Sequence, residues 1–176
     1  YDCYCATVNN AGSQITNITI TGTAMNNTTG GGTAPSYASS YPATGSTTAS
    51  MVQGASYPVS VTFDPSSVGS IWIDYNQDGI YDATEWVQTG TTGTSHTAMI
   101  TIPPTALSGQ TGMRVRSRGT GNQNGSGDAC LAMGGGETED YTIIIVAATP
   151  CAGTPDPVTI VAPAGICLGD DLLLSA

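Results

Sequence analysis

The sequence predicts an all-β protein, an antiparallel β-sandwich of about seven to nine strands with a jelly-roll or immunoglobulin-like architecture. Apolar and polar residues alternate in several short segments, most clearly at Tyr57, Val59, Val61 and Phe63, which is the pattern of a half-buried strand. No stretch shows the period of an amphipathic helix. Glycine, proline and asparagine separate the segments and indicate turns. Two packed sheets are therefore favoured over any helical architecture.

Seven strands are expected, over residues 14–22, 56–63, 69–73, 85–89, 96–102, 112–118 and 139–146. Segment 26–50 is rich in glycine, threonine and serine, and we expect a long surface loop there with a weak edge strand over 36–41. Tyr37 and Tyr41 in this segment are candidate ligand contacts, because exposed aromatic rings stack on sugars or on neighbouring proteins. Packing over the edge of the core is the alternative for both.

The strongest motif is the stretch 74–85, in which oxygen-bearing residues recur with the spacing of an EF-hand calcium loop. Calcium prefers about six to eight oxygen ligands, and alternate residues of a tightly turning loop point inward to supply them. Gly79 stands at the sixth position, where the loop bends sharply. The predicted ligands are the side chains of Asp74, Asn76, Asp78, Asp82 and Glu85 and the carbonyl of Ile80.

The residues that flank this loop differ from those of an EF-hand, because 70–73 and 86–88 are β-branched or aromatic and predict strands instead of helices. We therefore expect a structural Ca²⁺ site that fixes a connection between two strands, not a calcium sensor. A metal-free surface turn rich in Asp, Asn and Gly is the alternative.

The chain is strongly acidic, with 13 acidic residues against three basic ones and a formal net charge of −10. This charge argues against nucleic acid and anionic membranes as partners. The chain contains no lysine, which excludes Lys–Asn isopeptide cross-links and Schiff-base chemistry.

All three basic residues occupy alternate positions of one expected strand, at Arg114, Arg116 and Arg118, so they share one face of it. We expect them to form structural ion pairs with a second acidic cluster, because guanidinium suits carboxylates. That cluster consists of Glu137, Glu139 and Asp140. A site for an acidic ligand or a sulfated glycan is the alternative.

The five cysteines favour an oxidising, extracellular setting. The preferred disulfides are Cys5 with Cys130 and Cys151 with Cys167, which leaves Cys3 free, bonded to another subunit, or bonded to a residue outside this chain. A zinc site from Cys3, Cys5 and His96 fits no common ligand spacing. The sequence shows no transmembrane run and no signal peptide. Because it begins at Tyr1, it fits a processed mature protein or a fragment, and we infer secretion to the medium or the cell surface.

No catalytic residues are expected. His96 is the only histidine, so a Ser-His-Asp triad would have to use it, and we expect a surface position for it. The pairs available among Glu137, Glu139 and Asp140 are expected to have depressed pKa values beside the arginines, which is the wrong direction for a general acid in glycoside hydrolysis.

Four motifs make the chain resemble the GEVED domain of secreted Bacteroidota-type surface proteins, over roughly residues 4–146. The motifs are Tyr4-Cys5, Ile71-Trp72-Ile73-Asp74-Tyr75-Asn76-Gln77-Asp78-Gly79, Met113-Arg114-Val115-Arg116 and Gly136-Glu137-Thr138-Glu139-Asp140-Tyr141-Thr142. Thr138 replaces the valine of the family name, and Tyr75 stands where phenylalanine is common; neither change removes a predicted ligand. The resemblance implies a non-catalytic β-sandwich module over 1–149, of a kind often attached to type IX-secreted enzymes and adhesins.

Residues 150–176 differ in character and look like the opening of the Ig-like repeats that follow such modules in adhesins. The apolar run 171–174 cannot bury itself alone. One hypothesis is that this extended tail is donated as a strand to a neighbouring subunit and builds a filament. The alternative is a truncated domain whose end lies on its own sandwich.

The sequence thus predicts a non-catalytic, extracellular structural or adhesion module stabilised by Ca²⁺. Its expected partners are further copies of itself or neighbouring domains of a larger adhesin, and glycans are a further possibility. The alternative is a carbohydrate- or surface-binding accessory module of a secreted hydrolase or protease.

Overall fold

The computed structural model describes residues 4–7, 9–34 and 36–149. These residues form strands and two short 3-10 helices. In chain order the elements are β1 Gln14–Ile20, β2 Asn26–Thr28, β3 Ala38–Tyr41, η1 Gly45–Thr47, β4 Ser50–Val52, β5 Ser56–Asp64, β6 Ser67–Ile73, η2 Ala83–Glu85, β7 Trp86–Gly90, β8 Ser95–Thr101, β9 Gly109–Gly119 and β10 Glu137–Val146.

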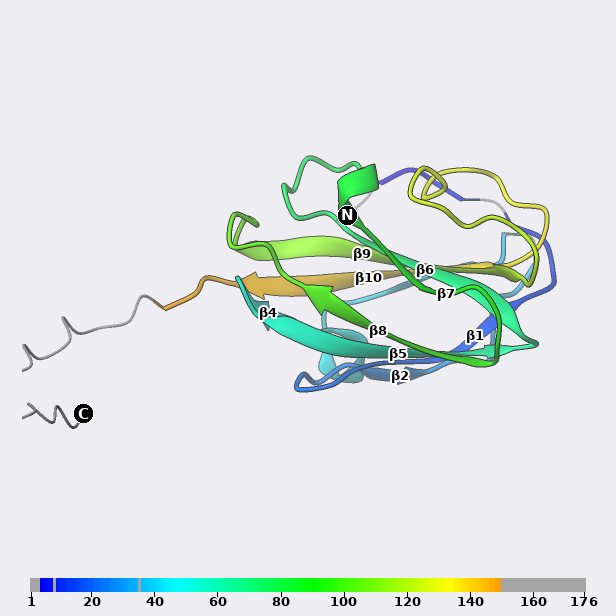
Figure 1. The fold of residues 1–176 in the computed structure, drawn as a ribbon, viewed down its shortest axis with the longest axis horizontal. Coiled ribbons are helices and arrows are strands. Elements are labelled where there is room, and N and C mark those ends of the chain that lie inside the picture. The colour runs from blue at the N-terminus through cyan, green and yellow to red at the C-terminus, as the bar shows by residue number, and fades with distance from the viewer. Residues whose placement is uncertain (1–3, 8, 35, 150–176) are drawn as a thin grey trace, which may run out of the picture.

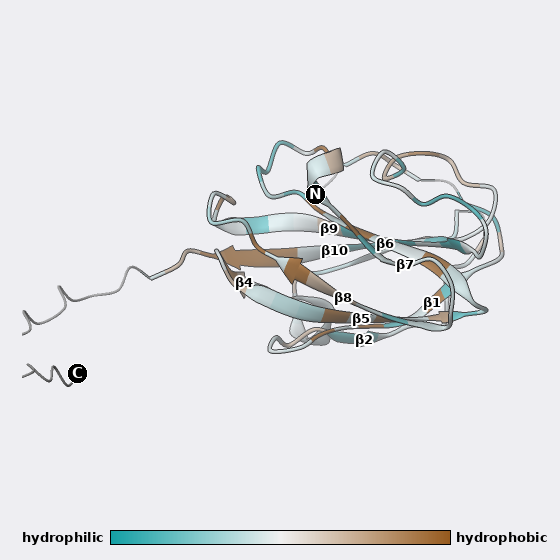
Figure 2. Cartoon of the chain, in the orientation of Figure 1, coloured by the Kyte–Doolittle hydropathy of each residue, from teal (hydrophilic) through white to brown (hydrophobic). Residues whose placement is uncertain are grey.

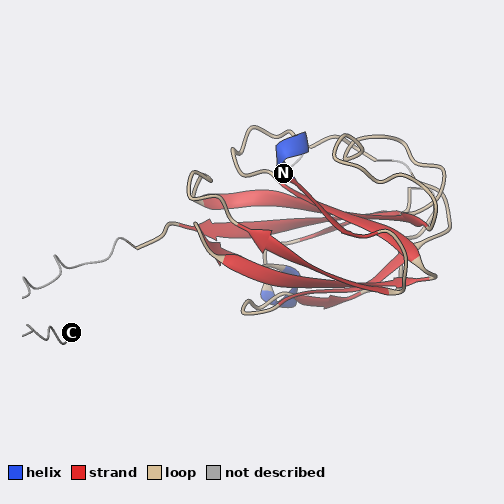
Figure 3. Cartoon of the chain, in the orientation of Figure 1, coloured by secondary structure: helices blue, strands red, loops and turns tan. Residues whose placement is uncertain are grey.

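The strands form two sheets that face each other, so the predicted β-sandwich is confirmed (Figures 1 and 3). The four-stranded sheet A has the order β2-β1-β5-β8. The six-stranded sheet B has the order β3-β10-β9-β6-β7, with β4 also paired to β10. All seven expected strands are present. The expected weak edge strand is β3, which, like β4, pairs with β10 in parallel while the other pairs are antiparallel.

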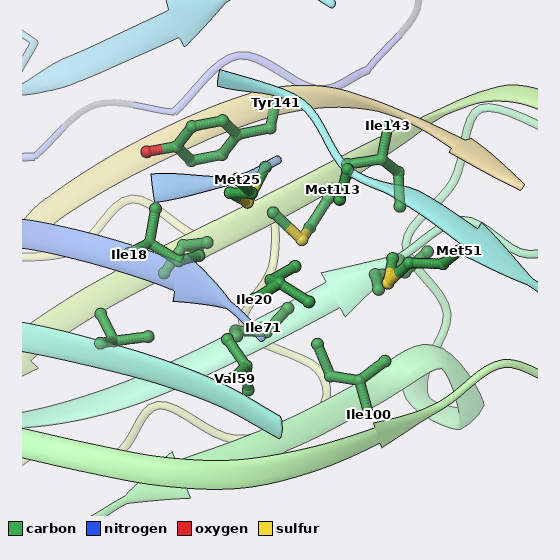
Figure 4. Packing of buried hydrophobic residues seen from close by; sticks show 14 of the residues in the cluster. Ile18, Ile20, Met25, Met51, Val59, Ile71, Ile100, Met113, Tyr141 and Ile143 are labelled. Carbon is green, nitrogen blue, oxygen red and sulfur yellow. The ribbon is translucent and has the colours of Figure 1, made fainter. Parts of the chain in front are cut away.

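The core fills the space between the sheets because alternate side chains of each strand point inward. Sheet A contributes residues such as Ile18 and Val59, and sheet B contributes Met113 and Ile143, all fully buried. Figure 4 shows these side chains meeting between the two layers. In Figure 2 the C-terminal half of β10 is strongly apolar. In β5, Val59, Val61 and Phe63 are buried and the residues between them are not, so this strand has the predicted alternation.

Sheet B is buried on its outer face as well. All seven residues of β6 are buried, because loop 120–136 and the N-terminal segment lie over that face. Trp72 anchors this cover, since its indole Nε1 donates to the carbonyl of Ser126 at 2.9 Å. Trp72, Tyr81 and Ala129 form a second buried cluster, against which Tyr4 and Trp86 pack. Sheet B is therefore covered on both of its faces.

Among the described residues, no helix is both long enough and apolar enough to cross a membrane. Residues 150–176, expected to form an extended tail, lie outside the described residues.

Gly136, the residue directly before β10, offers a sharp test of this packing. Its φ is 139°, and a Cβ at this position would collide with the carbonyl oxygen of Ser117 on β9. Gly136→Ala is expected to lower the free energy of unfolding by at least about 2 kcal/mol, measured by urea denaturation. Gly134→Ala is the matched control, because nothing lies within 4 Å of its added Cβ. Equal stability of the two variants would contradict the described register.

Candidate functional site

The candidate calcium loop, residues 74–85, connects the end of β6 to the start of β7, and its last three residues form η2. β6 and β7 are antiparallel neighbours, with Trp72 opposite Trp86. The loop therefore closes a corner between two paired strands, as the flanking sequence predicts, and no helix pair surrounds it.

The first half of the loop turns around the carboxylate of Asp74. Its Oδ1 accepts the backbone N–H of Asp78 at 3.3 Å, and its Oδ2 accepts that of Gly79 at 3.0 Å. The Asn76 side-chain oxygen also accepts the Asp78 N–H, at 3.1 Å. Gln77 and Gly79 have φ values of 57° and 83°, which is the left-handed conformation that such a bend requires. The side-chain oxygens of Asp74, Asn76 and Asp78 thus all accept backbone N–H groups of the same turn.

Glu85 closes the loop from its far end. Its Oε1 accepts the backbone N–H groups of Tyr75 and Asn76 at 2.7 and 3.4 Å, and its Oε2 accepts that of Asp82 at 3.1 Å. Burial raises the pKa of Glu85, although these three amide bonds act in the opposite direction. The twelfth residue of the loop therefore reaches back to the first positions.

Two carboxylates of this loop are buried without a basic partner. Asp74 is 0% and Glu85 6% exposed, while the salt bridge found among the described residues joins Arg114 to Asp140 elsewhere. Within the same residues, no group of three or more His, Cys, Asp and Glu side chains gathers at metal-binding spacing. The other predicted ligands lie nearer the surface. The Asp78 side chain accepts the Ile80 N–H at 2.8 Å, and Asp82 and the Ile80 side chain are exposed.

The arginine row of β9 lies on the outer face of sheet B. Arg114 is 1% exposed and forms a two-pronged ion pair with Asp140, with Nε–Oδ1 and Nη2–Oδ2 both at 2.7 Å. Its other donors reach the carbonyls of Cys5 and Ala129 and the Sγ of Cys5. Burial lowers its pKa, but the bond and charge of Asp140 outweigh this, so the net direction is upward.

Arg116 makes no such ion pair, although it is 0% exposed. Its Nε donates to Thr138 Oγ1 at 3.0 Å and its Nη2 to Asn9 Oδ1 at 2.9 Å. Its remaining bonds go to the carbonyls of Asp128, Ala129 and Leu131. Burial, together with the nearby charge of Arg114, lowers its pKa to about 10. Arg118 donates to the carbonyl of Gln123. Apart from the Arg114–Asp140 pair, the arginine donors therefore bind mainly backbone carbonyls of loop 120–136 and not acids.

Glu137 and Glu139 point away from these arginines, so the expected ion pairs with them are wrong. The register sets Glu137 opposite Ser117 and Glu139 opposite Val115, which places both side chains on the core side. Glu137 Oε2 accepts the Ile15 N–H at 2.7 Å. Glu139 accepts the hydroxyls of Tyr141 at 2.7 Å and Tyr41 at 3.3 Å. The strand period places Glu137 and Glu139 on one face of β10 and Asp140 on the other, and the register against β9 makes the first of these faces the inner one.

The expected depression of these pKa values is also wrong. Glu137 and Glu139 are 1% and 0% exposed, and burial raises the pKa of both, that of Glu139 to about 7. Hydrogen bonds from Tyr141 to Glu139 and from the Ile15 amide to Glu137 only partly offset the lost hydration.

The two tyrosine candidates and the histidine lie in packed positions. Tyr41 stacks on Tyr141 with ring centroids 4.9 Å apart, which matches the packing alternative. Tyr37 is half-buried, with a φ of 46°. His96 is 5% exposed, so the expected surface position is wrong. Its burial is tolerated because its ring nitrogens contact Thr89 Oγ1 and the Thr92 carbonyl, both at 3.1 Å.

The Cys5–Cys130 disulfide is formed, across a sequence separation of 125 residues. It fastens the N-terminal segment to loop 120–136. Cys3, Cys151 and Cys167 lie outside the described residues. Sequence reasoning missed Tyr4 and Tyr81 as site residues; the only available signal was the position of Tyr4 inside a family-like motif.

The buried Glu139 makes stability depend on pH. Its pKa is about 7 in the fold against an ordinary value of 4.5, so the folded chain holds a proton that the unfolded chain has released. Stability should therefore fall as pH rises from about 4.5 to about 7, by on the order of 1–3 kcal/mol. Glu139→Gln should flatten this difference, measured by denaturation at fixed calcium.

Asp64→Asn serves as its control, since Asp64 is an exposed carboxylate on β5. If Glu139→Gln kept the full decline while the control behaved as the parent, the burial of Glu139 would not be its cause.

Residues 68–144 match the family model described as the GEVED domain. No curated protein and no solved structure matched the chain. The matched stretch runs from β6 to β10 and includes the candidate calcium loop, the arginine row and the buried glutamates. The expected resemblance is therefore confirmed over this stretch, which includes three of the four motifs: the chain contains a GEVED domain.

Proposed function

We propose that this protein is a non-catalytic extracellular module, stabilised by calcium in loop 74–85, that serves adhesion or assembly outside the cell. The observation that carries this proposal is the burial of Asp74 and Glu85, at 0% and 6% exposure, in a loop with calcium-ligand spacing. Neither makes an ion pair within the described part of the chain.

A divalent cation explains why such a loop stays folded. Buried carboxylates without counter-charge are costly, and their mutual repulsion adds to the cost; Asp74 indeed contributes to the raised pKa of Glu85. Bound Ca²⁺ would supply the missing positive charge. The residues that would hold it are Asp74, Asn76, Asp78, Asp82 and Glu85, with the Ile80 carbonyl.

A role without chemistry is supported by the placement of the groups that enzymes use. His96 is buried, and both of its ring nitrogens are engaged. Glu137 and Glu139 face the core, where substrates have no access. An extracellular setting is supported by the Cys5–Cys130 disulfide, since such bonds persist under oxidising conditions.

Assembly through residues 150–176 is supported by how the sandwich is completed. The described strands enclose a core of their own, and the apolar run 171–174 is too short to bury itself alone. Strand donation to a sheet edge is a general way to bury such a run.

A second candidate function, a carbohydrate- or surface-binding accessory module, is favoured by one observation. A pocket of about 340 Å³ with tyrosines in its lining opens on sheet B, and sugar-binding sites commonly combine aromatic faces with a few polar groups.

Calcium removal tests the main proposal. At free calcium about 100 times the Kd, binding should add about 2.7 kcal/mol to stability, so EGTA should lower Tm and increase proteolysis of loop 74–85. Asp78→Ala should abolish the difference between calcium and EGTA, because it removes one predicted ligand while leaving the buried Asp74 in place. Calorimetric titration with Ca²⁺ should show binding to the parent chain and none to Asp78→Ala.

The matched control is Thr84→Ala, an exposed loop position outside the ligand spacing, which should bind calcium as the parent does. A parent chain with the same Tm in calcium and in EGTA, and with no heat on titration, would refute the calcium proposal.

Deletion of residues 150–176 tests assembly. The shortened chain is expected to remain a folded monomer with the Tm of the parent, because the described residues enclose a core of their own. The parent should form larger species in light scattering. Monomeric behaviour of both chains at high concentration would rule out strand donation between copies.

A further inference from the structure

The pocket of about 340 Å³ lies on the outer face of sheet B, away from the core. Gly112 of β9 and Asp140 and Thr142 of β10 contribute to its lining, and Ser40 of β3 lies at its side. The N-terminal segment at Tyr4 adds a further wall. These four segments of the chain therefore meet around one pocket, at a place where β9 and β10 run side by side (Figure 1).

One wall of the pocket is aromatic. Tyr4 and Tyr81 stack with ring centroids 4.6 Å apart and an interplanar angle of 16°, and the Arg114 guanidinium carbon lies 5.0 Å from the Tyr81 ring centroid. Tyr81 is 6% exposed, whereas Tyr4 is only partly buried. Tyr81 thus lies buried between Tyr4 and Arg114, and part of the Tyr4 side chain remains accessible.

Arg114 offers nothing to an anion. A guanidinium has five N–H donors, and those of Arg114 are taken by Asp140, the Cys5 carbonyl and Sγ, and the Ala129 carbonyl. An acidic or sulfated ligand would find no free donor on Arg114 and would face the Asp140 carboxylate. The net charge of −10 disfavours anions further.

Asp140, in contrast, remains available as an acceptor. Its side chain is 29% exposed, and each of its oxygens accepts one bond from Arg114, which leaves lone pairs for a ligand donor. The ion pair already compensates its charge, so a cationic ligand gains little there. The pocket favours a neutral molecule that combines hydroxyl donors with an apolar face.

We propose that this pocket binds a neutral saccharide ring, with ring hydroxyls donating to Asp140 and one ring face lying against Tyr4. Ser40, which is exposed, and Thr142 supply further hydroxyl groups at the side and floor. This inference deepens the second candidate function, the accessory binding module, and rests on it.

The same wall connects the pocket to the candidate calcium loop. The Tyr4 hydroxyl donates to Asp74 Oδ2 at 2.7 Å and accepts the Gly112 N–H at 3.0 Å. Ordering of Asp74 therefore fixes the position of the Tyr4 ring in the pocket.

Calorimetric titration of the full chain, in calcium, tests the proposal. The probes are neutral oligosaccharides of glucose, galactose, mannose and N-acetylglucosamine, with a sulfated oligosaccharide and a lysine-rich peptide for comparison. At least one neutral series should bind. Ser40→Trp, which fills the pocket from its exposed side, should weaken that binding at least tenfold. Thr97→Trp, exposed on β8 of the opposite sheet, should leave it unchanged, and both variants should keep the parent Tm.

The outcomes separate this proposal from the calcium proposal. Binding of no neutral probe, binding of only the charged probes, or equal loss in both tryptophan variants would overturn the saccharide site while leaving calcium-dependent stability intact. Calcium-independent stability with saccharide binding lost only in Ser40→Trp would support the pocket and refute the calcium site.

Tyr4→Phe keeps the ring but removes the bond to Asp74. It should lower saccharide affinity several-fold and make affinity insensitive to EGTA, whereas a merely structural role would change Tm without changing the calcium dependence of binding.

Discussion

Two buried arginines on β9 organise the outer face of sheet B, and much of the remaining structure depends on them. Arg114 and Arg116 are 1% and 0% exposed, and a charged group in that position is tolerated only when its donors are satisfied. Backbone carbonyls of loop 120–136 and of the N-terminal segment accept five of the ten hydrogen bonds that the two guanidinium groups donate. The need to satisfy these donors therefore determines where two long irregular segments lie, and the Cys5–Cys130 disulfide fastens the same two segments together.

Covering this face gives the sandwich a second buried layer and creates its surface features. Trp72 packs under the cover together with Tyr81, so β6 is buried on both faces. Tyr4, brought over the sheet by the same segment, contacts both the pocket and Asp74 of the candidate calcium loop. The proposed saccharide site and the proposed calcium site are consequently linked through one hydroxyl, that of Tyr4.

Acidic groups in the domain lie in three different environments, which decides what each can do. Asp140 on the outer face is paired with Arg114. Glu139 on the core side is surrounded by tyrosine hydroxyls, and burial raises its pKa to about 7. Asp74 is buried in a tight loop and accepts only neutral donors among the bonds described. Only the last environment combines burial, calcium-ligand spacing and a missing counter-charge.

The sequence by itself determined the sandwich, its seven longer strands and the calcium-like spacing of 74–85, because each depends on local period or on spacing along the chain. For Cys5–Cys130 it offered a preference among several pairings, and the fold decides this disulfide by bringing together cysteines 125 residues apart. It also predicted that the arginines share a face, since strand geometry dictates this. Which acids face them was decided by the register of β10 against β9, which turns Glu137 and Glu139 inward and Asp140 outward. The burial of His96 and the Tyr4–Tyr81 wall likewise depend on tertiary contacts between segments far apart in sequence, which no local pattern encodes.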